Sequence, residues 1–576
     1  MIVRIIEYND LFPEEIQLPD IRTLISHINR EHLVSLVINM MNRLSDKPFY
    51  NPSSKASTPD DVDYLRFFLS GKNATFIKEA IQRYKHFEQK VKTSGYSGTI
   101  YSTRPAAILL LLKYIFSVQP CKDTLSPQME IDYFKALLIA NQEVNTARLS
   151  ELKDDEPATL QLAQTLIAYS YSNEGIENKD YHDSFRRQLI KFCDLYRFLT
   201  WNKRLKPLRR AFCKEYHIRN LASYLVPHLI SLEVTNLKSG FIAIRNRKGL
   251  SRVAYRIMCK SSINVNEIIP FEKNVDYSFF RAKPFIRLTE HEFAVVSIPF
   301  LLEHIYESLY FELKKHKSEV GYKNDDSFRE FITTEFTQNW MMNGFMDKCK
   351  SSVQAISLCD DDCNNIISNN KSQKGVHPLD YYLREGDNVV LFELKSTLAS
   401  ASTKDKRNLN DFLADLKERF FESKRQRPKA IRQLIANAKA IQKGTFIFDS
   451  SVNKWATIYP VIVVDSIYYT MVGVRMLLES WMREHCITEG IDESKVKPII
   501  LMDISILRLY SSLFRERGFV AVFEEYYSKI GKGNTLSEII LSEQMSFSEY
   551  LLKQPIENVE GIFENLTRGV IKQAGK

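Results

Sequence analysis

Asp380, Glu393 and Lys395 are the residues whose types and spacing point most directly to chemistry. They lie in the segment HPLDYYLREGDNVVLFELKSTL, where two apolar runs, residues 376–383 and 389–397, flank the turn sequence REGDN. This pattern predicts a β-hairpin. Because side chains alternate between the two faces of a strand, Glu393 and Lys395 point the same way, and a tight hairpin brings Asp380 beside them. Two carboxylates and one ammonium are therefore expected to converge.

The two faces of the second strand have different predicted roles. Leu391 and Thr397 share the face of Glu393 and Lys395, whereas the alternate residues Val390, Phe392 and Leu394 are expected to face the core.

The expected arrangement suits a divalent cation. Two carboxylates in one small space stay ionised at low cost only if a cation lies between them. Mg²⁺ takes oxygen ligands and is commonly held by one or two carboxylates plus substrate phosphate. A metal held there polarises a phosphodiester and supplies hydroxide near neutral pH, and Lys395 would orient the attacking water and offset charge on the phosphorus oxygens. We expect Mg²⁺ as the cofactor, with Mn²⁺ able to substitute.

Pro378, Asp380, Glu393 and Lys395 together resemble the signature of the PD-(D/E)XK, or restriction-endonuclease-like, superfamily. The resemblance covers roughly residues 300–510, in which a helix, the hairpin, a helix and further strands follow in the family's order. It implies that Asp380 and Glu393 are metal ligands and that Lys395 is the catalytic lysine. Leu379 separates Pro378 from Asp380, which is a small departure because the proline varies in this superfamily.

The tetrapeptide FELK occurs twice, at residues 311–314 and 392–395. The first copy lies in a helical pattern without a hairpin or a partner acid, and predicts a solvated helix face. The second copy follows a turn, has apolar residues on one strand face and has an acid across the turn. The alternative interpretation of the second copy is a structural hairpin with a surface salt bridge, since paired charges across strands are common.

The superfamily often adds an acid from the helix before the hairpin. A helix is expected at about residues 326–349, with Asp326 as its N-cap, and it offers Glu330 and Glu335. Glu335 falls inside the apolar stripe of this helix, and Glu330 falls on the opposite side. A carboxylate on a buried face needs a partner or a metal. Glu335 is therefore the expected third metal ligand and Glu330 the alternative, while a plain surface acid is the other interpretation of both.

The superfamily also often places a polar residue on the helix after the lysine strand, touching the scissile phosphate. The sequence RPKAIRQLIANAKAI offers Gln433, with Lys429 and Arg432 beside it. The interval from Lys395 to Gln433 is longer than usual, so the intervening basic segment is interpreted as an inserted DNA-binding helix. Solvent-facing polar residues are the alternative.

Positive charge is concentrated in two windows. The formal net charge is +9, yet residues 181–220 carry eleven Lys/Arg against three Asp/Glu, and residues 404–443 carry twelve against five. Such clustering is typical of nucleic-acid-binding surfaces. Trp201, Phe212 and Tyr216 in the first window could stack on unpaired bases, or the window could be a solvated helix face with its aromatics turned inward. The expected nucleic-acid contacts are Lys203, Arg204, Arg209, Arg210, Lys424, Arg425, Arg427, Lys429 and Arg432.

Other patterns exclude several classes of protein. The eight cysteines show no dense pattern, which favours reduced thiols. Cys359 and Cys363 have no second Cys or His pair at zinc-finger spacing, so CDDDCNNIISNNKSQKG is interpreted as an exposed polar loop. No apolar run is long enough to span a bilayer, and the acidic first residues do not fit a signal peptide. We therefore expect a cytoplasmic protein with no membrane partner.

The 576 residues predict several domains. Helical periodicity dominates residues 1–230, which we interpret as a recognition or assembly domain. Residues 231–300 form a small β-rich segment with expected strands at 241–245, 253–259 and 285–298. Residues 301–515 form the nuclease-like core, a mixed sheet flanked by helices, and residues 516–576 a helical extension. The expected fold class is α+β or α/β multidomain.

These observations favour a metal-dependent endonuclease, and DNA is the expected substrate because the resembled superfamily mostly cuts DNA. Restriction of foreign DNA, such as phage DNA, is the corresponding setting. Two alternatives stay open: a non-cutting nucleic-acid-binding or scaffolding subunit, and an RNA endonuclease with the same metal chemistry. The chain lacks a P-loop motif, so an NTPase would be a separate subunit. The other partners considered are a recognition subunit and a second copy of the chain.

Overall fold

The computed structural model describes residues 4–15, 17–43, 69–95, 100–121, 126–149, 158–172, 181–236, 240–245, 249–270, 277–369, 377–396, 409–471, 473–530 and 545–556. Helices dominate, and the strands form mixed sheets. This confirms the predicted α+β class. Among the described residues, no helix is long and apolar enough to cross a membrane.

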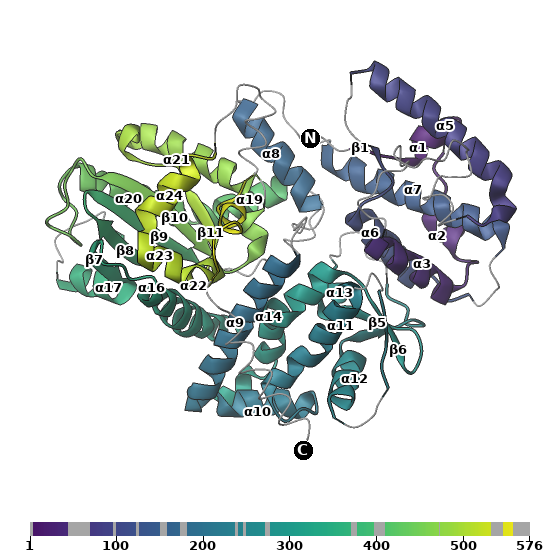
Figure 1. Cartoon of the computed structure of the whole chain (residues 1–576), viewed down its shortest axis with the longest axis horizontal. Helices are drawn as coiled ribbons and strands as arrows, with labels where there is room; N and C mark the ends of the chain where they lie inside the picture. Colours follow the sequence, from purple (N-terminus) through teal and green to yellow (C-terminus); the bar gives the residue numbers. More distant parts are fainter. Residues whose placement is uncertain are drawn as a thin grey trace.

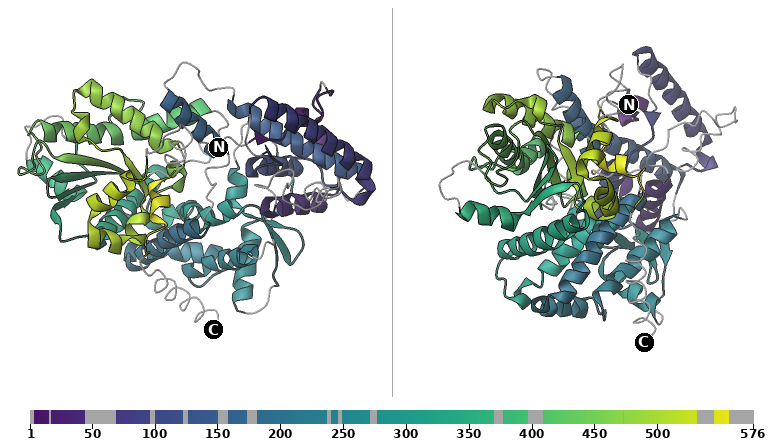
Figure 2. Two further views of the ribbon diagram at one scale, coloured as in Figure 1. Left: turned by 45° about the horizontal axis from the view of Figure 1, so that its top comes forward. Right: turned by 60° about the vertical axis from the view of Figure 1, so that its left-hand side comes forward.

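The first part of the chain is a helical body. The apolar run at residues 106–112 lies in α6, whose side chains there are buried because helices pack around it. The purple and blue helices of this body lie on the opposite side of the molecule from the green and yellow sheet region (Figures 1 and 2). Its elements are β1 (Arg4–Ile5), α1 (Tyr8–Leu11), α2 (Ile21–Ile25), α3 (Arg30–Arg43), η2 (Gly71–Asn73), α5 (Ala74–Thr93), β2 (Ile100–Tyr101), α6 (Pro105–Ser117) and α7 (Pro127–Leu149).

A four-stranded sheet follows, in the order β3-β6-β5-β4. Its strands are β3 (Phe241–Ala243), β4 (Ser262–Asn264), β5 (Phe285–Arg287) and β6 (Glu292–Val295), and the helices beside it are η4 (Leu221–Leu225), α11 (Val226–Asn236), α12 (Leu250–Lys260) and α13 (Ser278–Ala282). The strand predicted at residues 253–259 is wrong, because this segment lies in α12. Its buried residues Ala254, Ile257 and Met258 recur at helical spacing, which an alternation argument over seven residues does not resolve.

The larger sheet has five strands in the order β11-β10-β9-β8-β7. The strands are β7 (Gln354–Cys359), β8 (Tyr381–Glu385), β9 (Asn388–Lys395), β10 (Thr457–Val464) and β11 (Ile500–Asp503). Strands β7, β8 and β9 are antiparallel neighbours, and β9, β10 and β11 run parallel. The predicted mixed sheet is confirmed.

Helices cover both faces of this sheet. Val390, Phe392 and Leu394 of β9 pack into the core formed with α9, α14 and α22 to α24, while Val389 and Leu391 pack against α19, α20 and α21. The prediction that only one face of β9 meets the core is therefore incomplete. Thr397 lies outside the described residues. The covering helices are α8 (Ala158–Ser172), α9 (Tyr181–Trp201), α14 (Ile298–Lys314), α19 (Leu409–Phe420), α20 (Ala430–Gln442), α21 (Val474–Glu489), α22 (Ser505–Leu509), α23 (Ser511–Arg517), α24 (Phe519–Tyr527) and α26 (Phe547–Leu551).

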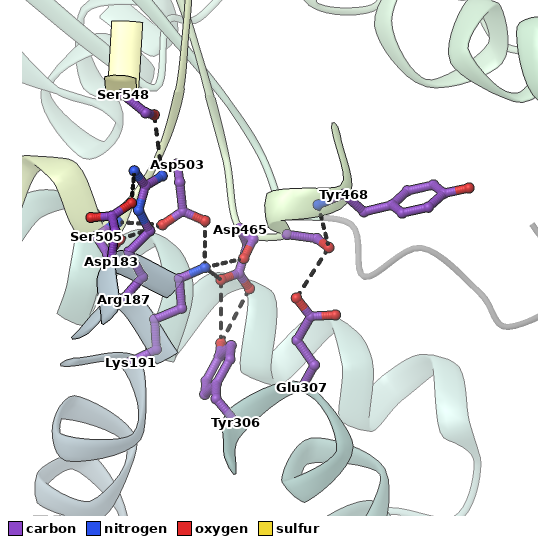
Figure 3. Close-up of polar contacts among 11 residues, drawn as sticks. Asp183, Arg187, Lys191, Tyr306, Glu307, Asp465, Tyr468, Asp503, Ser505 and Ser548 are labelled. Carbon is purple, nitrogen blue, oxygen red and sulfur yellow. Dashed lines mark hydrogen bonds and ion pairs between the residues drawn. The ribbon is translucent and has the colours of Figure 1, made fainter. Parts of the chain in front are cut away.

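A buried charged network, here called the Lys191 cluster, joins α9 to the carboxyl ends of β10 and β11 (Figure 3). It consists of Lys191, Tyr306, Asp465 and Asp503. The Lys191 ammonium lies 2.6 Å from Asp503 Oδ2 and donates to the Asp465 carbonyl oxygen at 2.5 Å. The Tyr306 hydroxyl donates to Asp465 Oδ2 at 3.2 Å. Residues far apart in the sequence thus hold α9 against the sheet.

Candidate active site

The hairpin of β8 and β9 positions the predicted acids. Tyr381 pairs with Phe392, and Glu385 pairs with Asn388, which leaves a two-residue turn. Gly386 begins this turn with a φ of 59°, a conformation that favours glycine. Extending the register by one residue places Asp380 opposite Glu393. The hairpin prediction is confirmed, although the turn is shorter than the predicted REGDN and β8 starts at Tyr381.

Asp380, Glu393 and Lys395 come together as the spacing predicted. Asp380 Oδ2 accepts a hydrogen bond from the Leu394 amide at 2.6 Å, which turns the carboxylate across the hairpin. The Lys395 ammonium lies 3.0 Å from Glu393 Oε2. The two carboxyl groups are close enough to change one another's pKa. The structure therefore shows two acids and one ammonium converging at the end of β9.

The site is electrostatically unusual because Glu393 is deeply buried. Its residue is 1% exposed, and burial raises the pKa of its carboxyl to about 8, with the charge of Asp380 adding to the rise and Lys395 opposing it. Burial likewise raises the pKa of Asp380, against the charge of Lys395. Burial lowers the pKa of Lys395, but the charges of Glu393 and Asp380 outweigh it, so the pKa of Lys395 is raised overall.

One carboxyl oxygen of Glu393 lacks a hydrogen-bond donor among the described residues. Glu393 Oε1 is buried and accepts no hydrogen bond from the described residues, and the Glu393 carboxyl lies within hydrogen-bonding reach of the Asp380 carboxyl. A buried carboxylate oxygen without a donor or a cation is costly. Asp380 and Glu393 are hard oxygen ligands of the kind that Mg²⁺ uses, and one or two carboxylates are sufficient when water and phosphate complete its shell. The residues present therefore fit the expected cation.

The predicted third acid is not where the sequence placed it. The preceding helix is built from α15 (Asp325–Phe331), the π-helix η6 (Ile332–Asn343) and α16 (Gly344–Lys348), with Asn324 as its N-cap in place of Asp326. Glu335 is exposed, as is Glu330, so the prediction that Glu335 lies on a buried face is wrong. A π-helix has a wider turn than the 3.6 residues assumed for the stripe, which changes the residues that face inward.

Thr337 and Gln338 occupy the inward face of η6. Gln338 Nε2 donates to the Asp380 carbonyl oxygen at 3.2 Å, and the Ser396 hydroxyl donates to Thr337 Oγ1 at 3.2 Å. Both residues are buried. The helix before the hairpin thus supports the ends of β8 and β9 with an amide and a hydroxyl.

Asp360, at the start of α17 (Asp360–Asn369), is the acid that sequence reasoning missed. The charge of Asp360 raises the pKa of Asp380. The pKa of Asp360 is itself raised, mainly by burial and then by the charge of Asp361, while hydrogen bonds from Gln338 and Asn343 oppose the rise. Asp360 Oδ1 is buried without a hydrogen-bond partner among the described residues. The prediction of an exposed loop at CDDDCNN is wrong, because these residues end β7 and begin α17. The run of aspartates could have indicated the helix, since acids are favoured in the first turn of a helix.

The acids do not form a three-carboxylate cage. Among the described residues, no group of three His, Cys, Asp or Glu side chains lies close enough together to hold a metal ion. A cation at this site would therefore depend on Asp380 and Glu393, and Asp360 contributes negative charge near Asp380.

Gln433 lies beside Lys395, as predicted despite the long interval between them. Its Oε1 accepts from the Lys395 ammonium at 3.4 Å. Gln433 is on α20, which packs against the same face of β9. Arg432 Nη1 pairs with Glu422 Oε2 at 2.7 Å, and Lys429 is the half-buried N-cap residue of α20. Of the three, Gln433 is the residue that reaches Lys395.

The basic segment before α20 forms α19 and then an exposed turn. Lys424, Arg425 and Arg427 are exposed on this turn, which we call the basic loop (residues 421–429). The loop is closed by hydrogen bonds from the Ser423 amide to the Arg427 carbonyl oxygen at 2.9 Å and from the Lys429 amide to the Phe421 carbonyl oxygen at 2.9 Å. A helix, α19, lies in this segment, of which residues 397–408 are outside the described residues, and the predicted contacts Lys424, Arg425 and Arg427 follow it.

The first basic window lies on α9, η3 (Lys203–Leu205) and α10 (Lys206–Glu215). Lys203, Arg204 and Arg210 are exposed, and Arg209 is half-buried and donates to Thr200 Oγ1 at 2.9 Å. These are the predicted nucleic-acid contacts of this window.

The aromatic residues of this window do not all face outward. Phe212 and Tyr216 are buried and stack on each other with centroids 4.6 Å apart, so the prediction that they stack on bases is wrong. Trp201 is 73% exposed.

The first FELK copy lies in α14, as predicted, and Lys314 pairs with Asp325 at 2.8 Å. Its Glu312 is not solvated, because it is buried and accepts from the Tyr216 hydroxyl at 2.9 Å. Identical tetrapeptides therefore occupy a helix and a strand.

The chain matches no protein-family model, no curated protein and no solved structure. The function is therefore argued from the geometry of the site.

Proposed function

We propose that this protein is a Mg²⁺-dependent endonuclease that hydrolyses phosphodiester bonds of DNA. The observation that carries the proposal is the convergence of Asp380, Glu393 and Lys395 at the end of β9, with Glu393 Oε1 buried and accepting no hydrogen bond from the described residues. The mixed five-stranded sheet and the helix on each side are supporting features, because the resembled superfamily presents its acids on such a hairpin.

Each side chain has a role that follows from its position. Asp380 and Glu393 would hold the cation, which when bound polarises the phosphodiester and lowers the pKa of water. Lys395 is held by Glu393 and Gln433, so its ammonium has a defined direction and can offset charge that develops on the phosphorus oxygens. Gln433 and the Asp380 contacts restrict the rotamers on which this geometry depends.

The basic loop supports a polyanionic substrate. The basic loop immediately precedes α20, the helix that bears Gln433, and it presents Lys424, Arg425 and Arg427 to solvent. Such residues neutralise phosphates and give salt-dependent affinity without sequence information. The choice of DNA over RNA as the proposed substrate rests only on the resemblance to the PD-(D/E)XK superfamily.

The test compares Asp380→Asn and Lys395→Ala with wild type on duplex DNA, single-stranded DNA and matched RNA, in Mg²⁺, Mn²⁺ and EDTA. We expect Lys395→Ala to lower the cleavage rate by about 10²- to 10³-fold, and Asp380→Asn to abolish metal-dependent cleavage. Lys314→Ala, in the helical FELK copy, and Glu335→Gln, on the exposed helix face, are matched controls that should cut at the wild-type rate. Cleavage that survives both site substitutions would remove this site as the active site.

The same experiment separates the alternatives. Binding that persists in EDTA, with no cleavage of any substrate in either metal, would indicate a non-cutting nucleic-acid-binding subunit. Cleavage of RNA alone would indicate the RNA endonuclease.

A further inference from the structure

A basic cavity lies at the far end of α20 from the basic loop. It has a volume of about 230 Å³ and is lined by the end of α20, the loop before β10 and the turn after α21. Lys443, Lys454 and Lys495 supply three ammonium groups, and Ile491 and Trp455 supply apolar surface. These residues lie outside the candidate active site and have no part in the proposed hydrolysis.

The cavity lining carries a net positive charge, because four lysines face one aspartate. Lys443, Lys454 and Lys495 form no ion pair with the described residues, whereas Lys439 at the rim pairs with Glu489 at 2.7 Å. Asp492, a carboxylate in the lining, keeps its negative charge, which acts on Lys495, while its Oδ1 accepts from the Ser494 amide at 3.0 Å and from the Ser494 hydroxyl at 2.6 Å. An anion entering the cavity therefore meets free ammonium groups.

Trp455 adds an aromatic surface that is open to solvent. Its residue is 62% exposed, and the Lys454 ammonium lies 5.2 Å from the centroid of its ring. An exposed indole beside lysines suits a flat aromatic ligand that also carries negative charge. A nucleotide combines a base that can stack with a phosphate that lysines bind.

The walls of the cavity are held in place before any ligand arrives. The loop that bears Trp455 is tied to β8 by Asp449, whose Oδ2 accepts from the Tyr382 hydroxyl at 2.9 Å and from Arg384 Nε at 2.6 Å. On the other side, Gln442 and Asp492 exchange two hydrogen bonds, at 3.0 and 2.9 Å. Binding to a preorganised site loses less conformational entropy than binding to a mobile one.

We propose that this cavity is a nucleotide-binding pocket, in which the base stacks on Trp455 and the phosphate contacts Lys443, Lys454 and Lys495. Gln442 follows Gln433 by nine positions in α20, a rise of roughly 13 Å along the helix. If the proposed function holds, on which this part of the inference rests, the pocket takes an unpaired nucleotide of the substrate strand beyond the cleavage site. A free nucleotide offers the same chemistry, and the experiment distinguishes the two sources.

Binding is measured in EDTA, so that cleavage does not interfere, with a short single-stranded oligodeoxynucleotide, a blunt duplex of the same sequence, and dAMP. Trp455→Ala should weaken single-strand binding by roughly 5- to 150-fold, the range for removal of one stacked base. It should leave blunt-duplex binding unchanged, because a paired base cannot stack on the indole.

Substituting Lys443, Lys454 and Lys495 together by Ala should lower the slope of log affinity against log salt by about 0.7 for each phosphate that these lysines neutralise in the wild-type complex. The matched charge control is the triple Ala variant of Lys72, Lys78 and Lys85, which are exposed on the helical body and should leave the slope unchanged. Trp455 is exposed, so its replacement by Ala should leave the circular dichroism spectrum unaltered.

Single-strand binding that depends on Trp455 supports the pocket as a binding site for the substrate strand. If Trp455→Ala weakens the binding of dAMP but not of the single strand, the pocket is supported as a site for a free nucleotide. If the Trp455→Ala variant and the triple lysine variant both bind the single strand and dAMP with wild-type affinity, the inference is overturned. If the wild-type protein never cleaves but Trp455→Ala weakens its binding, the proposed function is refuted and the pocket is supported. If the Trp455→Ala variant cleaves and binds normally, only the pocket is refuted.

Discussion

Replacing Lys191 by methionine removes a buried ammonium and keeps a side chain of similar length. Lys191 is fully buried, and its ammonium lies 2.6 Å from Asp503 Oδ2 and 3.8 Å from Asp465 Oδ1. The substitution leaves Asp465 in the interior without its cation and leaves Asp503 with the charge of Arg187 alone. Removing one partner of a buried ion pair typically costs about 3–5 kcal/mol of unfolding free energy. For an unfolding unit of about 150–250 residues this corresponds to a Tm lower by roughly 6–20 °C.

The cost of Lys191→Met should depend on pH in a direction set by Asp465. Burial raises the pKa of Asp465 to about 6, and the charge of Lys191 opposes that rise. Because the folded state holds this proton more tightly than the unfolded state, the contribution of Asp465 to stability is fully present below about pH 4 and is lost as pH rises through about 6. Without Lys191 the pKa of Asp465 rises further, so the loss of stability extends to higher pH.

The assay is urea unfolding followed by circular dichroism at pH 5 and pH 8. We expect Lys191→Met to cost more at pH 8 than at pH 5, and Asp465→Asn to remove much of that difference. Lys92→Met is the matched control, because Lys92 forms an exposed pair with Glu88 at 2.9 Å, and such pairs are worth about 0.3–0.5 kcal/mol. A cost for Lys191→Met at pH 8 no larger than that of Lys92→Met would refute the reasoning.

Three further outcomes follow from the site. Burial raises the pKa of Glu393 to about 8, so Mg²⁺ has to displace a proton when it binds. The affinity for Mg²⁺, measured by calorimetry, should therefore rise roughly tenfold per pH unit up to about pH 8. Glu393→Gln should abolish this pH dependence, and a flat profile for the wild-type protein would contradict the prediction. Gln433→Ala should lower kcat and leave KM nearly unchanged, because Gln433 acts through Lys395; a change confined to KM would show a substrate contact instead. Replacing Lys424, Arg425 and Arg427 together by Ala should lower the salt slope of duplex binding by up to about 0.9 for each phosphate contact, and an unchanged slope would exclude the basic loop from the interface.

The candidate catalytic triad could be predicted from the sequence because its geometry is local. A two-residue turn and strand alternation together determine that Asp380 lies opposite Glu393 and that Lys395 shares a face with Glu393. The buried strand β10 was predictable for a similar reason, since an apolar run bounded by polar residues is typical of a central strand.

Other parts of the site depended on the helix geometry and on packing. The apolar stripe that selected Glu335 assumed 3.6 residues per turn, and the wider turn of η6 placed Thr337 and Gln338 inward instead. Asp360 is brought near Asp380 by the pairing of β7 with β8, which its own polar surroundings in the sequence did not indicate.

By itself, the sequence determined the hairpin, the identity and convergence of Asp380, Glu393 and Lys395, and the α+β class, because each depends on periodicity or on neighbours along the chain. Only the tertiary structure decided that Lys191 meets Asp465 and Asp503, which lie 274 and 312 residues away. It likewise decided that lysines from α20, a loop and a turn share one cavity with Trp455. Contacts at such separations depend on how whole helices and sheets pack, and side-chain patterns in the sequence carry little information about that packing.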